Sequence, residues 1–479
     1  MKGLFALLAL PAVLAIASCG GGSTAPPLTP LVPVPAGTPV GGSPIQHVIV
    51  IIQENRTFDN LFNGFAYGFS TPANYQTFGF DHNGNKVNLA PHGLEWQFDP
   101  SHAHASLVTE YNNGAMNGFD LDTCDYNPLG PGGDCSGLFD GPPANFTYAY
   151  VPGPVNPTDI SSETTTLWLL AGYAPGKGYG IADNMFSSRQ VPSFPGHQYL
   201  IAGQGPADDP NNSTGLTAGN WGCDSPPNTT ANIFGATYTA PLIPTFPCYN
   251  YQTIGDLLDA KNVSWKYYTG ALNTLDGLIS AYDAIQHIRF GPDWTSNIST
   301  PMTNILSDLQ NNTLPAVSFV TPAGPASDHA GFLSTAGPGW ISTIYLYLAQ
   351  NPKLYANTVI FVTWDDSGGW YDHVPPPSDS FGPLGFRVPL LVISPYSVQR
   401  ISHVQHDYGS ILHFIEKNWS LGTLGQRDAV ADDLSDMLNY SQPPIQPLSK
   451  EPAFEQSARK YTQAYFMNLH GDHPVDDDR

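Results

Sequence analysis

Acidic and amide side chains stand directly after two apolar runs of the sequence. Glu54 and Asn55 follow "HVIVIIQ", and Asp365 and Asp366 follow "TVIFVTW". Carboxylate and amide oxygens are the ligands that hard divalent cations prefer. The stretch "DDSGG" by itself is also typical of an acidic turn, but two separate runs that both end in such pairs favour a metal site. The sequence therefore predicts one divalent ion bound by these four side chains, and it allows Ca, Mg, Mn, Fe or Zn.

A serine in a restricted loop is a candidate nucleophile beside such an ion. Ser193 lies between two prolines in "RQVPSFPGHQYLIAG", and His197 follows four residues later. A metal ion can activate a hydroxyl group and offset the charge of a phosphoryl group, so Ser193 is suited to attack a phosphate ester. Ser187 and Ser188 compete for this role, and a metal-bound water would need no protein nucleophile. His197 either orients the metal ligands or supports the serine loop.

The elements that would carry these side chains are short and apolar, and apolar and polar residues do not alternate in them. This pattern is typical of strands covered on both faces. Such runs lie at 47–52, 316–322, 358–364 and 389–395. Apolar residues recur at helical spacing in two further segments, 341–350 and 409–419. We therefore expect an α/β fold, a three-layer α/β/α sandwich with a mostly parallel central sheet and long Gly/Pro-rich loop insertions.

Residues that follow the strands of such a sheet share one crevice, because ligands bind beyond the carboxyl ends of parallel strands. This rule places Asp328 and His329, which follow the run at 316–322, near the predicted metal ligands. Asp372 and His373 lie a few residues after Asp366. They could orient the ligands or form a packed turn, and we favour the first interpretation.

Composition excludes one class of partner. Only 12% of the residues are charged, compared with about 25% in an average globular protein, and the chain contains 47 Gly and 46 Pro. The formal net charge is −23, so the field of the whole protein repels polyanions. Nucleic acid is therefore not an expected partner, although a local metal site could still bind a phosphate.

The N-terminal residues predict export and attachment to a membrane. Residues 1–18 have the composition of a secretory signal, and the run that ends at Cys19 is similar to a bacterial lipobox, whose cysteine becomes lipidated. Residues 19–44 read as a Gly/Pro-rich tether. We expect a lipid-anchored protein at the outer membrane or cell surface, facing the periplasm or the exterior. No later segment predicts a transmembrane helix.

Four further cysteines predict disulfides, because their number is even in a chain expected to be exported. We expect the pairs Cys124–Cys135 and Cys223–Cys248, each closing a Gly/Pro/Asn-rich insertion. Buried free thiols are the alternative. A metal site formed by these cysteines is disfavoured because no CxxC spacing occurs.

A series of motifs resembles one known family. In order along the chain they are "ENRTFDNLFNGF", "EYNNGAMNGFD", "PSFPGHQYLIAGQ", "SWKYYTG", "SDHAGF", "TWDDSGGWYDHVPPP", "VPLLVISPYS" and "HDYGSILHFIEKNW". The series resembles the bacterial phosphoesterase family of acid phosphatases and phospholipases C, which is similar to alkaline phosphatase in fold. The resemblance implies a catalytic domain at 45–450, followed by a C-terminal tail at 451–479.

The resemblance also implies roles for single residues. Glu54, Asn55, Asp365 and Asp366 would bind the metal, and Ser193 would be the nucleophile. The assisting histidines of the family would correspond to His329 and His102, with His104 as a competing match to the second.

Several positions depart from the family pattern, and the role of Arg56 has two interpretations. Tyr267, Tyr268 and Thr269 stand where the family often has a histidine pair, and Tyr408 replaces another common histidine. Part of the phosphate-binding shell is therefore in doubt. Arg56 could contact a phosphate oxygen, or it could form a salt bridge with Asp59.

The predicted function is a metal-dependent hydrolase of phosphate esters. A serine in place of the threonine of family phospholipases favours an acid phosphatase-type phosphomonoesterase that acts through a phosphoseryl intermediate. The alternative is a phospholipase C that acts on phosphodiester head groups. The alternative outside enzymes is a surface-displayed module that binds a metal or ligand without turnover. The sequence does not predict the oligomeric state.

Overall fold

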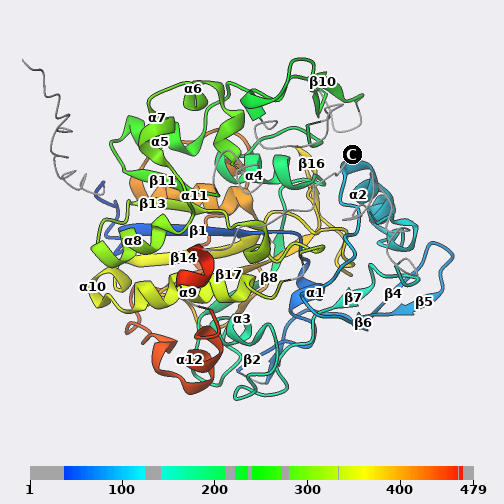
Figure 1. The fold of residues 1–479 in the computed structure, drawn as a ribbon, viewed down its shortest axis with the longest axis horizontal. Coiled ribbons are helices and arrows are strands. Elements are labelled where there is room, and N and C mark those ends of the chain that lie inside the picture. The colour runs from blue at the N-terminus through cyan, green and yellow to red at the C-terminus, as the bar shows by residue number, and fades with distance from the viewer. Residues whose placement is uncertain are drawn as a thin grey trace, which may run out of the picture. The chain divides into compact units, whose positions relative to one another are not determined.

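Neighbouring strands of one large sheet carry the side chains of the predicted metal site. A computed structural model describes residues 37–68, 70–124, 142–210, 222–235, 240–270, 280–332, 334–461 and 463–467. Within these residues the central sheet has nine strands (Figure 1). Their order across the sheet is β12 (Ile298–Ser299), β11 (Trp265–Tyr268), β13 (Val317–Val320), β1 (His47–Gln53), β14 (Thr358–Trp364), β17 (Arg387–Ile393), β8 (Gly180–Phe186) and β18 (Ile401–Ser402), and β19 (His406–Asp407) also pairs with β8.

Most neighbouring strands of this sheet are parallel. The pairs from β12 through β11, β13 and β1 to β14 are all parallel, whereas β17 runs antiparallel to both β14 and β8. All seven residues of β14 and six of the seven of β1 are buried, as expected for strands covered on both faces. The α/β fold with a mostly parallel sheet is confirmed.

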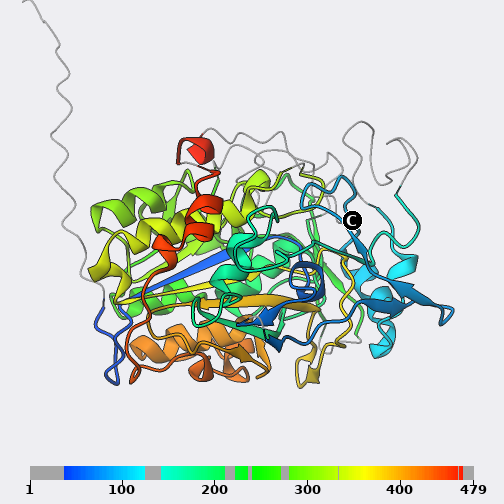
Figure 2. The same ribbon diagram turned by 90° about the horizontal axis from the view of Figure 1, so that it is seen from below.

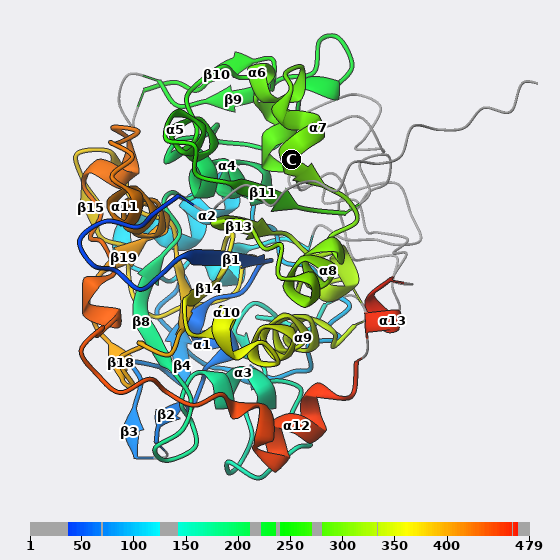
Figure 3. The same ribbon diagram turned by 90° about the vertical axis from the view of Figure 1, so that its left-hand side faces the viewer.

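Helices cover both faces of the sheet. Figure 2 shows the sheet between two layers, with the orange helix α11 (Tyr408–Trp419) on one side and the yellow-green helix α9 (Gly337–Ala349) on the other. In Figure 3, α4 (Ser193–Ala202) and α5 (Ile254–Ala260) lie on the side of α11, while α8 (Asn304–Asn311) and α10 (Pro352–Tyr355) lie beside α9. The predicted three-layer arrangement is therefore present.

The predicted strands and helices match the structure closely, with one difference in direction. The segments predicted at 47–52 and 358–364 form β1 and β14, and the helices predicted at 341–350 and 409–419 form α9 and α11. The segment predicted at 389–395 forms the antiparallel strand β17. Residues that follow β17 therefore leave the sheet at the opposite edge from the predicted site.

The remaining elements are short and mostly peripheral. Small two-stranded sheets are formed by β2 (Ala66–Tyr67) with β3 (Thr71–Pro72), β4 (Phe78–Phe80) with β5 (Lys86–Asn88), β6 (Ala90–Pro91) with β7 (Ala149–Tyr150), β9 (Ala231–Ile233) with β10 (Ile243–Thr245), and β15 (Ser378–Asp379) with β16 (Gly382–Pro383). The further helices are α1 (Phe58–Leu61), α2 (His104–Tyr111), α3 (Thr165–Leu170), α6 (Gln286–Arg289), α7 (Asp293–Asn297), α12 (Pro452–Ala458) and α13 (Gln463–Met467).

One of the two predicted disulfides is present, and the other lies partly outside the described residues. Cys223 and Cys248 are bonded, with their Cα atoms 4.4 Å apart. Cys124 is buried, but Cys135 is outside the described residues, so the predicted pair Cys124–Cys135 stays a prediction. The signal at 1–18 and most of the tether at 19–44 are also outside them. No helix in the described part of the chain is both long enough and apolar enough to span a bilayer.

Candidate active site

The register of the central strands brings the four predicted metal ligands together. Gln53 at the end of β1 stands opposite Trp364 at the end of β14. Because the two strands are parallel and adjacent, the residues that follow them leave the sheet side by side. The backbone N–H of Asn55 donates to Asp365 Oδ1 at 3.1 Å, and the backbone N–H of Asp366 donates to the same oxygen at 2.9 Å. The four side chains therefore share one buried site.

Two unusual backbone positions allow this close approach. Asn55 adopts a left-handed conformation with a φ of 61°, which Asn tolerates better than most other residues and which turns the chain sharply after β1. Gly196 allows α4 to pack against the other ligand loop, because a Cβ at this position would lie 2.6 Å from the backbone oxygen of Asp365. Gly196 is a residue whose importance the sequence analysis missed.

The hydroxyl group of Ser193 lies among the predicted ligands. Ser193 is the first residue of α4, and its Oγ lies 3.1 Å from Glu54 Oε2, 3.3 Å from Asn55 Oδ1 and 3.2 Å from Asp366 Oδ2. A hydroxyl has a single proton and donates to one acceptor at a time. The lone pairs of the other two oxygens remain available, and a cation would satisfy them. This position suits the nucleophilic role that the sequence predicts for Ser193, and the role stays a prediction.

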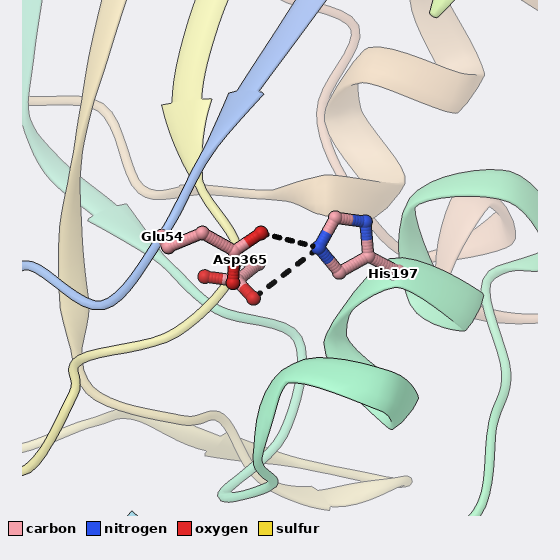
Figure 4. Close-up of side chains that lie close together, drawn as sticks. All are labelled: Glu54, His197 and Asp365. Carbon is pink, nitrogen blue, oxygen red and sulfur yellow. Dashed lines mark hydrogen bonds and ion pairs between the residues drawn. The ribbon is translucent and has the colours of Figure 1, made fainter. Parts of the chain in front are cut away.

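His197 extends this group on the other side of Glu54. Its Nε2 lies 3.0 Å from Glu54 Oε1 and 3.3 Å from Asp365 Oδ2, as Figure 4 shows. One ligand atom from each of these three residues falls within 4.8 Å of the others, a spacing that can hold a metal ion. Ser193 and His197 are four residues apart on one helix and so share a face. The sequence predicted a loop around Ser193, which is wrong, because α4 begins at this residue and gives the four-residue spacing its common face.

Burial and mutual repulsion shape the titration of the site. Burial raises the pKa of Glu54 to about 7, with a further increase from nearby Asp365. Burial and the charge of Asp365 also raise the pKa of Asp366 well above its usual range. Although burial opposes a charge on His197, nearby Tyr267, Glu54 and Asp365 raise its pKa well above the usual range. A divalent cation would relieve the repulsion among these carboxylates, so the donor set fits such an ion.

Two histidines approach the same edge of the sheet. The Nδ2 of Asn55 donates to His102 Nε2 at 2.9 Å, and His102 Nδ1 donates to the carbonyl oxygen of Pro100. The ring of His329 lies 5.8 Å from that of His102, and its Nδ1 donates to the carbonyl oxygen of Ala330. In each ring a backbone carbonyl fixes Nδ1 as the donor, which orients Nε2. The structure thus brings both predicted histidines together beside the ligand group.

The competing residues lie apart from the ligand group. Ser187 Oγ donates to the carbonyl oxygen of Arg189, and Ser188 Oγ donates to Asp407. His104 begins α2, and its Nδ1 donates to the carbonyl oxygen of Gln190. Ser193 and His102 are therefore better placed for catalysis than their competitors, although their roles stay predictions.

Of the two alternatives for Arg56, the ion pair with Asp59 is wrong. Asp59 is bonded instead to Arg387, at 3.1 Å, and to His373, at 2.6 Å. Arg387 also pairs with Asp372 at 3.0 Å. Arg56 follows the sharp turn at Asn55, and its guanidinium group bonds instead to the carbonyl oxygen of Asp328 in the loop after β13.

Asp372 and His373 do not orient the metal ligands, which corrects the favoured interpretation of this pair. Their side chains bond to Asp59, Asn74, Val374 and Arg387, and none of these partners is a predicted ligand. The three acidic and imidazole groups could in principle hold a metal ion. The buried guanidinium of Arg387 already supplies the positive charge there, so this cluster is structural.

The tyrosines that replace family histidines support the site indirectly. The hydroxyl of Tyr408 lies 2.6 Å from the carbonyl oxygen of Trp364 and 2.5 Å from that of Asp365, so it holds the ligand loop after β14. The hydroxyl of Tyr267 lies 3.4 Å from His197 Nδ1. Tyr268 instead donates to Asp308 at 2.6 Å. The sequence flagged these tyrosines as departures and did not predict their contacts.

The chain matches one family model and is similar to several known proteins. The sequence model described as "Phosphoesterase family" matches residues 45–422. Phospholipase C B of Mycobacterium tuberculosis is 25% identical over 455 residues, which cover 84% of this chain and 78% of that protein. Hemolytic phospholipase C of Pseudomonas aeruginosa is 22% identical over 446 residues, which cover 83% of this chain and 56% of that protein. A solved structure of an alkaline phosphatase superfamily protein from Vibrio parahaemolyticus has a TM-score of 0.29 and 12% identity. The match covers 52% of this chain and 61% of that protein.

Proposed function

The chain belongs to the phosphoesterase family and is a phosphoric ester hydrolase, and on this premise we propose that it cleaves phosphodiesters as a phospholipase C does, with Ser193 as the nucleophile. The observation that carries the proposal is the Ser193 hydroxyl, which lies within 3.3 Å of three oxygens from the ends of β1 and β14. The substrate class is supported by relatives named phospholipase C that align with more than four fifths of the chain. These relatives favour the phospholipase alternative over the expected phosphomonoesterase.

The first step forms a covalent bond to the serine. Ser193 Oγ attacks the phosphorus atom, and the bond between phosphorus and the diacylglycerol oxygen breaks. The hydroxyl proton passes to a carboxylate at hydrogen-bond distance, either Glu54 or Asp366. A divalent cation held by Glu54, Asn55, Asp365 and Asp366 would lower the pKa of the hydroxyl and offset the charge of the phosphate.

A histidine protonates the leaving group. His329, in its protonated form, donates a proton from Nε2 to the departing oxygen, because the carbonyl oxygen of Ala330 already engages its Nδ1. His102 is the less suited of the two predicted histidines, since its Nε2 accepts the hydrogen bond from Asn55 Nδ2. Water then attacks the seryl phosphodiester, the bond between phosphorus and Ser193 Oγ breaks as the carboxylate returns its proton to Oγ, and the phosphorylated head group leaves. The same histidine, now neutral, accepts the proton of that water.

A phosphomonoesterase is the second candidate. It is favoured by Ser193, because the acid phosphatases that this chain resembles have a serine where family phospholipases have a threonine. The two activities use the same nucleophile and differ in whether the phosphate carries one ester group or two.

The experiment compares short-chain phosphatidylcholine with 4-nitrophenyl phosphate as substrates of the purified protein, with and without a chelator. Ser193→Ala and Ser187→Ala are the matched variants, since both serines are buried and only the first contacts the ligand group. We expect release of phosphocholine by wild type and by Ser187→Ala, and none by Ser193→Ala or with chelator. Faster hydrolysis of the monoester would favour the second candidate. Full activity of Ser193→Ala would refute the assigned nucleophile.

A further inference from the structure

Arg56 is fully buried directly after the ligands Glu54 and Asn55. Its Nε donates to the carbonyl oxygen of Asp328 at 2.7 Å, and its other nitrogens donate to Asn60 Oδ1 at 3.1 Å and to the carbonyl oxygen of Leu94 at 3.4 Å. All three acceptors are amide oxygens. The shortest of these bonds therefore fixes the guanidinium against the loop that follows β13.

The carbonyl group that Arg56 holds belongs to the peptide between Asp328 and His329. A rotation of this peptide would move the Cα atom of His329, and with it the imidazole ring. Asp328 has a φ of 74°, a left-handed conformation that costs about 1 kcal/mol or more for a residue with a Cβ. Such a backbone persists only where its surroundings hold it, and the Arg56 bond is one of the contacts that does so.

The side chain of Asp328 receives bonds from both strands that carry ligands. Trp364 Nε1, at the end of β14, lies 3.2 Å from Asp328 Oδ2, and Gln53 Nε2, at the end of β1, lies 3.4 Å from the same oxygen. The backbone N–H of Arg56 donates to the carbonyl oxygen of Asp366 at 3.2 Å. Arg56 and Asp328 thus connect the loops after β1, β13 and β14.

We infer that Arg56 is a positioning residue that sets His329 relative to Ser193 through the backbone of Asp328, and that it is not a contact of the substrate phosphate. This inference rests on the proposed function, in which His329 protonates the leaving oxygen. Its consequence is that loss of Arg56 reduces acid catalysis rather than substrate binding.

The test is a double-mutant cycle between Arg56→Lys and His329→Ala, measured with two phosphodiesters that differ in leaving group. One releases 4-nitrophenolate, which needs little protonation, and the other releases an alkoxide, which needs a proton. Arg387→Lys is the matched control, because Arg387 is equally buried and contacts Asp59 and Asp372 instead of the site. Thermal unfolding and circular dichroism establish that each variant is folded.

We expect Arg56→Lys to lower kcat about tenfold or more for the alkoxide substrate, with a much smaller effect on the 4-nitrophenolate substrate and KM within about twofold. In the His329→Ala background, Arg56→Lys should have almost no further effect. Arg387→Lys should change kcat by the same factor for both substrates, in the wild-type and in the His329→Ala background. Asp328→Asn, which retains the side-chain shape but removes the charged acceptor of Trp364 and Gln53, should give the same leaving-group pattern as Arg56→Lys.

Different results overturn different statements. The positioning role would be refuted if Arg56→Lys lowered kcat equally for both substrates. It would also be refuted if the reductions in kcat caused by Arg56→Lys and by His329→Ala multiplied in the double variant. A raised KM with unchanged kcat in Arg56→Lys would show a phosphate contact instead and would also refute it. Wild-type protein that hydrolyses neither phosphodiester, or His329→Ala with full activity on the alkoxide substrate, would contradict the proposed function itself.

Discussion

Replacing Glu54 by Gln should stabilise the metal-free protein and remove its response to metal. Glu54 is buried among carboxylates, with Ser193 and His197 as its neighbours, so its negative charge costs free energy unless a cation is bound. Gln has nearly the same shape and no charge. A site built for a cation is expected to lower stability when the cation is absent, because function and stability compete for the same residue.

The magnitude and its pH dependence follow from the pKa of Glu54, which burial and nearby Asp365 raise from 4.5 to about 7. Each pKa unit corresponds to about 1.4 kcal/mol, so the ionised form costs about 3 kcal/mol in the folded protein. Because the folded state binds the proton more tightly than the unfolded state, stability falls as pH rises from 4.5 to about 7. Glu54→Gln should therefore gain about 3 kcal/mol at pH 8 and little at pH 4.5.

The assay is urea unfolding at pH 5 and pH 8, with chelator and with each candidate divalent metal. Glu416→Gln is the matched control, because burial and nearby Asp428 raise the pKa of Glu416 to about 8 and its side chain contacts the loop at Leu424. The control should gain stability at high pH while retaining the stabilisation by metal. The reasoning fails if metal-free Glu54→Gln is less stable than wild type at pH 8, or if metal stabilises it as strongly as wild type.

Three further outcomes follow from the site. Ser193→Ala should lower kcat about a thousandfold or more while metal still raises the unfolding midpoint, and loss of both together would contradict a nucleophilic role. Tyr408→Phe removes the hydroxyl that holds the carbonyl oxygens of Trp364 and Asp365. It should weaken metal binding about tenfold in a calorimetric titration. Unchanged affinity would show that the loop needs no such support. Gly196→Ala places a Cβ 2.6 Å from the Asp365 oxygen and should cost about 1 to 3 kcal/mol of unfolding free energy, whereas an unchanged value would mean that α4 shifts freely.

The order of residues along the chain was enough to predict a set of metal ligands. Apolar runs without alternation identified β1 and β14, and the pairs Glu54–Asn55 and Asp365–Asp366 stood at their ends. Since parallel strands deliver their carboxyl ends to one edge of the sheet, the sequence predicted that these pairs would meet. The four-residue spacing of Ser193 and His197 was also visible, but the sequence predicted a loop there, whereas the two residues lie on helix α4.

Contacts between distant residues were decided only by the tertiary structure. Arg56 and Asp59 are near neighbours in the sequence with opposite charges, yet Asp59 pairs with Arg387, which is 328 residues away. Asp372 and His373 follow the predicted metal ligands closely, yet Asp372 pairs with that same arginine and His373 with Asp59. Proximity in the sequence was a poor guide here because a sharp turn sends successive side chains in different directions.

The sequence by itself determined which residue types stand at the ends of the strands, because burial on both faces leaves a clear apolar pattern. The tertiary structure decided which of them face the crevice and what holds them there. Tyr408 shows the difference, since its hydroxyl fixes the Asp365 loop from α11, an element whose place against that loop no local pattern specifies. Strand order, register and backbone turns such as the one at Asn55 depend on packing over the whole chain, so these contacts could not be derived from the sequence alone.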